Sequence, residues 1–245
     1  GAAVLAVNTA DDRLEVLRFT EEDELVHVRS IPVGLDPVTV RLRTTHEAWV
    51  VNHISDSVSI VDLAAGTVVE TIDLPEKGHD VVFANDRAFI SVGTVNQVLV
   101  YDLPYSPGNT PTVIQIEGED PRSLATDGAT VYAAILNAGN GTTVLHHALV
   151  TDPNNNQYTG DPNPFPNDGD SFNPPINPDL LVDADGDGQL DIPMPRSAAI
   201  VKTDGSGTWF DDNDHEWTNA LLWDLHLHGM AVIDASTLDV TYETR

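Results

Sequence analysis

The residues best suited to bind an ion form one short acidic loop, Asp183-Ala184-Asp185-Gly186-Asp187-Gly188-Gln189-Leu190-Asp191. Carboxylates at alternate positions, with glycines that permit sharp turns, can surround a hard cation with oxygen ligands. We therefore expect a calcium site, and the alternative is a solvated acidic turn. The twelfth position is Met194 rather than the glutamate of an EF-hand, so a last ligand must come from elsewhere. The expected ligands are Asp183, Asp185, Asp187, Asp191 and the carbonyl group of Gln189.

A second metal-binding pattern is His226-Leu227-His228-Gly229-Met230. In an extended strand, alternate side chains point to the same face, so both histidines and the methionine would lie together. Two histidines suit zinc or copper, and a methionine thioether suits copper(I). Ordinary packing of these side chains is the alternative interpretation, and the one we favour.

Candidates for catalysis are few. The sequence contains no Gly-x-Ser-x-Gly elbow, phosphate-binding loop, His-Glu-x-x-His motif or Cys-x-x-Cys-His haem site. If the protein is an enzyme, we expect His53, His79 and Asp80 to contribute, because His79 and Asp80 open a predicted inner strand. A hydrolase, a lyase and a copper-linked redox protein are the alternatives to a binding protein, which we favour.

Charge excludes several kinds of partner. The 245 residues contain 39 acidic and 11 basic side chains, a formal net charge of −28. Such a surface repels phosphate backbones and anionic lipid headgroups, so neither nucleic acid nor a membrane surface is an expected partner. No apolar run approaches the roughly 18 residues of a membrane-spanning helix. There are no cysteines, and therefore no disulfide or thiolate metal site.

The elements that must position these residues follow a repeat. Residues 48–63 (AWVVNHISDSVSIVDL) and residues 88–103 (AFISVGTVNQVLVYDL) align without a gap at a spacing of 40, and residues 3–19 form an earlier copy. Each unit contains about four short strand signals separated by Asp, Asn, Gly or Pro turns; in the second unit they lie at 37–43, 47–53, 57–63 and 67–73. Repeated four-stranded units of this length are typical of β-propeller blades. A β-solenoid is the main structural alternative.

The repeat resembles the YVTN-type β-propeller family. The resemblance is carried by Trp49-Val50-Val51-Asn52 and Val58-Ser59-Ile60-Val61-Asp62, and it returns at Met230-Ala231-Val232-Ile233-Asp234. The third unit departs from it, with Ser91-Val92 where Val-Asn is expected. The resemblance implies a secreted or cell-surface propeller and no particular reaction. It also implies a ring of about seven blades, although we count only about four here.

The fourth unit is interrupted after its second strand. We predict propeller blades over 1–150, a long irregular acidic insertion over 151–222, and the rest of the fourth blade over 223–245. An incomplete ring would expose two unpaired ends, so further blades or a second copy of the chain are expected to cover them. The predicted function is that of an extracellular or cell-surface binding scaffold for an unidentified protein or surface ligand, with calcium stabilising the insertion.

Overall fold

The computed structural model describes residues 3–145, 199–203, 205–211, 214, 216–221 and 226–244. It divides into two compact units, one formed by Gly1–Gly139 with His226–Arg245 and the other by Asn140–Leu225. Among the described residues, no helix is long and apolar enough to cross a membrane.

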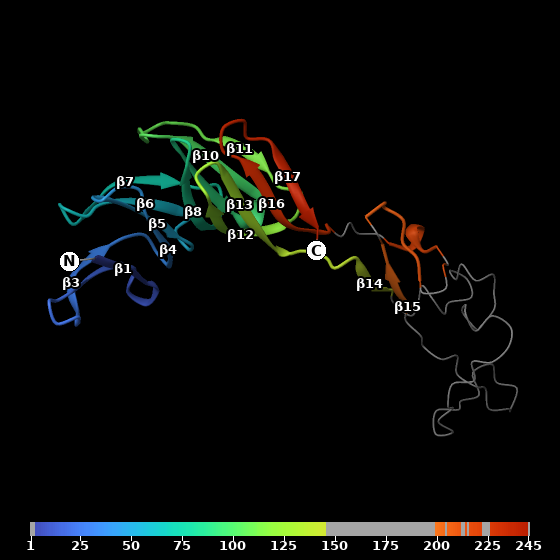
Figure 1. Ribbon diagram of the computed structural model, residues 1–245, viewed down its shortest axis with the longest axis horizontal. Coiled ribbons are helices and arrows are strands. Elements are labelled where there is room, and N and C mark those ends of the chain that lie inside the picture. The colour runs from blue at the N-terminus through green and yellow to red at the C-terminus, as the bar shows by residue number, and fades with distance from the viewer. Residues whose placement is uncertain are drawn as a thin grey trace, which may run out of the picture. The chain divides into compact units, whose positions relative to one another are not determined.

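The described part of the first unit contains four antiparallel sheets, which we call blades 1 to 4 (Figure 1). Blade 1 has three strands: β1 (Ala3–Asn8), β2 (Arg13–Phe19) and β3 (Leu25–Pro32). Blade 2 comprises β4 (Pro37–Leu42), β5 (Glu47–Asn52), β6 (Ser57–Asp62) and β7 (Thr67–Asp73). Blade 3 comprises β8 (Gly78–Ala84), β9 (Arg87–Val92), β10 (Gln97–Asp102) and β11 (Thr112–Gln115). Blade 4 comprises β12 (Glu119–Thr126), β13 (Thr130–Asn137), β16 (His228–Asp234) and β17 (Val240–Thr244).

The strand registers reproduce the sequence repeat. In blade 2, Glu47 pairs with Asp62. In blade 3, Arg87 pairs with Asp102, and each of these two residues lies 40 positions after its counterpart in blade 2. In blade 4 the corresponding pair is Thr130 with Asp234. The predicted all-β fold, built from four-stranded antiparallel propeller blades with an insertion in the fourth, is therefore confirmed.

Aspartate and asparagine recur because the turns require them. The hairpins between the second and third strand positions contain Asp12, Asp56 and Asn96. Asp12 follows the short 3₁₀ helix η1 (Thr9–Asp11), and Asn96 follows η2 (Gly93–Val95). All three of these residues have a positive φ, between 46° and 56°, a conformation that Asp and Asn tolerate better than most side chains. At the ends of strands, the carboxylate of Asp62 accepts hydrogen bonds from the backbone N–H groups of Ala64 and Ala65. Many of the acidic residues therefore form turns.

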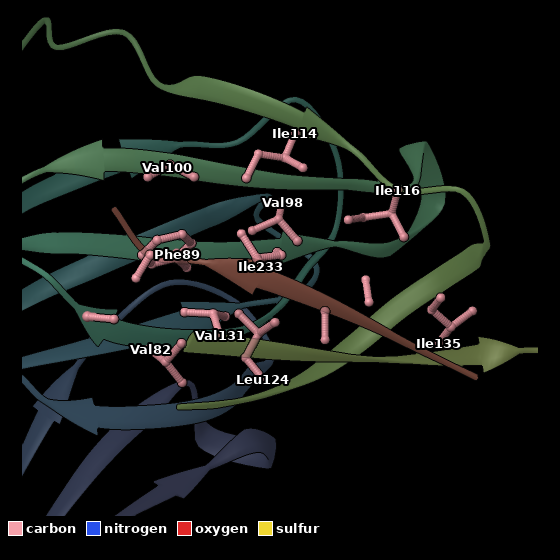
Figure 2. Packing of buried hydrophobic residues seen from close by; sticks show 14 residues of the cluster. Val82, Phe89, Val98, Val100, Ile114, Ile116, Leu124, Val131, Ile135 and Ile233 are labelled. Atoms are coloured by element: carbon pink, nitrogen blue, oxygen red, sulfur yellow. The ribbon is translucent and has the colours of Figure 1, made fainter. Parts of the chain in front are cut away.

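In the described part of the first unit, the hydrophobic core consists of three clusters, one at each junction between neighbouring blades. Figure 2 shows the cluster between blades 3 and 4, where Phe89, Val98 and Val100 pack against Val131 and Ile233. In blades 2 and 3, alternate residues of the central strands contact the blade before and the blade after, so these strands are apolar on both faces. The strands β5, β6, β9 and β10 are accordingly almost entirely buried.

The insertion begins where the other blades have a short hairpin. The chain leaves blade 4 near Gly139 and re-enters it near His226, and the Gly139 N–H donates to the His226 carbonyl at 2.8 Å. The described part of the second unit contains β14 (Thr142–Leu145) paired with β15 (Ala199–Lys202), and the 3₁₀ helix η4 (Thr218–Ala220). It has a small core of its own, formed by Leu145, Val201, Trp209 and Trp217.

Candidate functional site at the histidine pair

The candidate site begins with a bulge that the inner strands share. In β8, Gly78 pairs with Val92 and Asp80 pairs with Ser91, so His79 is an extra residue without a partner on β9. The inner strands β4 and β12 have a register shift at the corresponding place. Because a bulge bends the strand and redirects a side chain, the backbone of β8 sets the direction of His79.

His79 lies beside the second predicted histidine. The ring centroids of His53 and His79 are 4.8 Å apart, with 51° between the ring planes. His53 is in the turn after β5, and its Nδ1 lies 3.2 Å from the Gly78 carbonyl oxygen. Since a carbonyl oxygen can only accept, Nδ1 of His53 carries the proton, and Nε2 keeps its lone pair when the ring is neutral.

A carboxylate and a guanidinium complete the site. The Nε2 atom of His79 is 3.5 Å from Oδ1 of Asp120. Arg122 binds the other oxygen of this carboxylate, Oδ2. Its Nε donates to Oδ2 at 2.9 Å, and its second terminal nitrogen lies 2.7 Å from the same atom. Gly93 lies against this contact: a Cβ atom there would overlap Asp120 Oδ1 and come within 2.7 Å of His79 Nε2. The approach of His79 to Asp120 therefore depends on glycine at position 93.

The site keeps His79 neutral at pH 7. Burial lowers the pKa of His79 below its usual value of 6.5, and positive charge on His53 lowers it further, whereas Asp120 opposes the shift. The hydrogen bond with Asp120 raises the pKa of Arg122. The cluster therefore offers the neutral imidazole of His79, which can accept a hydrogen bond or a proton, beside an ion pair.

Asp80, the third residue we considered for catalysis, has a structural role. Its side chain is 7% exposed and accepts from Nε and NH2 of Arg41, at 3.2 and 3.0 Å. It also accepts from the backbone N–H groups of Val81, at 2.8 Å, and Leu124, at 3.0 Å. These bonds join the inner strands β4, β8 and β12. The structure thus brings His53 and His79 together, while Asp80 is fully engaged elsewhere.

Asp120 and Arg122 were not among the residues expected from the sequence, although a signal was present. Gly34-Leu35-Asp36-Pro37 and Gly118-Glu119-Asp120-Pro121 recur 84 residues apart. The N–H of Asp36 donates to Asp12 Oδ1 at 2.8 Å, and the N–H of Asp120 donates to Asn96 Oδ1 at 2.9 Å. The repeat therefore marks a recurring turn between blades, and in blade 4 this turn also presents the Asp120 carboxylate to His79.

A shallow depression adjoins the histidine pair. It has a volume of about 350 Å³ and is lined by Gly93, Thr94, Asn96, Glu119, Asp120 and Asn137. The lining includes the polar side chains of Thr94, Asn96, Glu119, Asp120 and Asn137. Within the described ranges, no group of three or more His, Cys, Asp or Glu side chains is arranged to hold a metal ion.

Neither predicted metal site is tested by the described residues. All five expected calcium ligands, Asp183 to Asp191, lie outside the described residues. His228 is at the start of β16, and its ring stacks on Tyr242 with centroids 4.4 Å apart. A register shift between His228 and Met230 interrupts the alternation on which the prediction of a shared His-x-His-x-Met face was based. The carbonyl of His226 accepts from Gly139, as described above. Copper or zinc at His226 and His228 stays a prediction.

No family model and no curated protein matches this chain. Solved structures do resemble it. Hydrazine synthase from Kuenenia stuttgartiensis is 18% identical, with a TM-score of 0.47 and alignment over 59% of this chain and 42% of that one. A 6-phosphogluconolactonase-like protein from Bacteroides uniformis is 16% identical (TM-score 0.46; 97% and 66% covered). A catalytically inactive virginiamycin B lyase from Staphylococcus aureus is 13% identical (TM-score 0.44; 54% and 45% covered).

This chain therefore spans between 42% and 66% of the length of these three proteins. At such identities a similarity concerns the fold alone, and function has to be argued from the site. The class of protein is that of the β-propellers, with four blades in the first unit, and the assignment rests on the repeated sheets described above.

Proposed function

We propose that this chain is an extracellular β-propeller binding module of the YVTN type, in which calcium stabilises the insertion. The blades act as the scaffold, and the face that carries the histidine pair and the adjoining depression contacts a protein or surface ligand. The net charge of −28 supports a partner that is neither nucleic acid nor an anionic membrane.

One observation favours binding over catalysis. The acidic groups closest to the histidine pair are already used to hold the structure: Asp80 links three inner strands, and Asp120 is paired with Arg122. General acid–base catalysis needs a group that is free to exchange protons with a substrate. The neutral His79 imidazole and the polar side chains that line part of the depression, such as Asn96 and Asn137, instead suit hydrogen bonding to a ligand.

The calcium part of the proposal rests on the spacing of Asp183, Asp185, Asp187, Gln189 and Asp191. A segment rich in Pro, Asn, Asp and Gly buries little apolar surface of its own, and a bound cation can order it. Calcium present at 100 times its Kd would stabilise the folded insertion by about 2.7 kcal/mol.

Chelation of calcium tests the proposed calcium site in the insertion. We expect EDTA to lower the melting temperature and expose residues 160–215 to protease, and calcium to reverse both effects. A variant with Asp183→Asn, Asp185→Asn and Asp187→Asn should no longer respond. The control, Glu21→Gln with Glu22→Gln in the exposed turn after β2, should respond like the unaltered chain. Melting and proteolysis that ignore calcium would contradict the structural calcium site.

A propeller enzyme remains the second candidate, and the lowered pKa of His79 favours it, because a neutral imidazole beside a carboxylate can act as a general base. A hydrolase or lyase of this kind should lose turnover in His79→Asn while keeping its melting temperature. Copper-linked redox chemistry at His226 and His228 is the third candidate function. It predicts a copper-dependent absorbance that disappears in His228→Asn.

A further inference from the structure

The blades pack against one another with a constant direction. We call the face of a blade that contacts the preceding blade its leading face, and the opposite face its trailing face. At the junctions, the trailing face contributes side chains from the same repeat positions, such as Trp49 in blade 2 and Phe89 in blade 3. The leading face also uses equivalent positions, such as Ala88 in blade 3 and Val131 in blade 4. The three junctions therefore use one packing arrangement.

The leading face of blade 1 is built like these but is uncovered. The registers place Val4, Ala6 and Leu17 at the positions that Ala48, Val50 and Val61 occupy in blade 2. In blade 2 these three side chains are 0% exposed. In blade 1, Ala6 is exposed and the other two are half-buried. Further along the same blade, Phe19 and Leu25 form a cross-strand pair and are 41% and 48% exposed.

The polar groups on this leading face are satisfied within the blade. Glu15 takes the place of the buried Ser59 of blade 2. Its carboxylate accepts from Ser30 Oγ and from Asn8 Nδ2, and lies 2.8 Å from His27 Nε2. A carboxylate that already has partners loses less when a neighbour displaces its water. The polar network therefore does not prevent another blade from packing there.

The trailing face of blade 4 is the complementary surface. Tyr132, Ala134, Met230 and Val232 occupy the positions of Phe89, Ser91, Val98 and Val100 in blade 3, as the two registers show. The blade 3 residues are at most 4% exposed. In blade 4, Ala134 is exposed and the other three are half-buried. Blades 1 and 4 stand at opposite ends of the series of blades in Figure 1.

We propose that a second copy of this chain covers both surfaces, the trailing face of blade 4 in each copy packing on the leading face of blade 1 in the other. The contact repeats the arrangement of the three existing junctions. It joins two different surfaces, so it is heterologous, and such contacts close into rings or extend into filaments. Two copies of four blades make eight, which is within the range of known propellers.

The large negative charge opposes the association. Two copies with a net charge of −28 each repel one another, and salt screens this repulsion over about 3 Å at 1 M against 8 Å at 0.15 M. The complex is therefore expected to strengthen with salt, whereas a contact made by ion pairs would weaken.

Sedimentation of designed variants tests the proposal. Leu17→Lys places a charge on the leading face and Val232→Lys places one on the trailing face; Val113→Lys, on the 51% exposed Val113 of β11, is the matched control. We expect the unaltered chain and the control to associate between 1 and 100 µM, and each face variant to do so at least tenfold more weakly. A mixture of the two face variants should form a 1:1 dimer that stops there, since one intact surface remains on each partner.

Circular dichroism should show native strand content for each variant alone, and the dimer in the mixture is a second check that both fold. An unaltered chain that stays monomeric at 100 µM in both 0.15 and 1 M NaCl would overturn the proposal and assign these faces to other blades. A mixture that stays monomeric, or a dimer that only one of the two variants weakens, would also overturn it.

Discussion

Replacing Asp80 by asparagine is the sharpest test of how the inner strands are held. The change keeps the shape of the side chain but exchanges one carboxylate oxygen for an N–H donor. Arg41 and the Leu124 N–H would then face a group that is neutral and, on one side, a donor itself. We therefore expect the variant to lose the ion pair and at least one further hydrogen bond.

The size of the effect follows from burial. A hydrogen bond to a charged group contributes about 1.5–3 kcal/mol, and breaking a fully buried ion pair costs about 3–5 kcal/mol. The Arg41 side chain is 47% exposed and can turn to water, which reduces the loss. We expect Asp80→Asn to lower the free energy of unfolding by about 3 kcal/mol. For an m-value of about 3 kcal/mol/M, the urea midpoint would fall by about 1 M.

Asp102→Asn is the matched control. Asp102 also pairs with an arginine, Arg87 Nε at 3.2 Å, but its side chain is 85% exposed. Its replacement should cost no more than about 0.5 kcal/mol. Urea unfolding followed by circular dichroism and by tryptophan fluorescence gives both values and checks whether one transition describes the first unit. Equal losses for the two variants would refute the role assigned to Asp80.

Two further predictions concern the histidine pair. Gly93→Ala should separate His79 from Asp120 and cost about 1–3 kcal/mol in the free energy of unfolding, because the added methyl group overlaps both side chains; denaturant titration measures the loss, and a neutral result would show that the contact is not tight. The His79 imidazole should titrate below 6.5 in an NMR experiment, and His53→Asn should raise its pKa, since positive charge on His53 lowers it. The unfolded chain binds this proton more readily than the folded one, so the contribution of His79 to stability is complete above pH 6.5 and is lost as the pH falls through the lowered pKa. An NMR titration that places the His79 pKa above 6.5 would contradict the argument.

Much of the fold was predictable because the repeat is local. The strand limits of blade 2 follow from Asp and Asn turns spaced about ten residues apart, and the observed β4 to β7 agree with the predicted segments within one residue. The split of blade 4 was also predictable, since Met230-Ala231-Val232-Ile233-Asp234 repeats a strand whose neighbour lies about 90 residues earlier.

The site was predictable only in part. His53 and His79 were candidates from the sequence, His79 because it opens a predicted inner strand. Their partner Asp120 comes from the next blade, and the bulge that redirects His79 depends on pairing across strands, which periodicity in one strand does not show. The role of Asp80 was missed for the same reason: its partners Arg41 and Leu124 lie 39 and 44 residues away in sequence.

The position of the insertion affects the order in which the blades can fold. Blades 2 and 3 close their central hairpins over four residues, His53–Asp56 and Gly93–Asn96. In blade 4, strands β13 and β16 must find each other across residues 140–225. Closing a flexible loop of that length rather than four residues costs about 2.7 kcal/mol more in chain entropy. The small core around Trp209 and Trp217 shortens the effective loop, so folding of the second unit should speed completion of blade 4. During synthesis, blade 4 is the last of these four blades to acquire its strands, and the apolar face of blade 3 that contacts it stays uncovered until then.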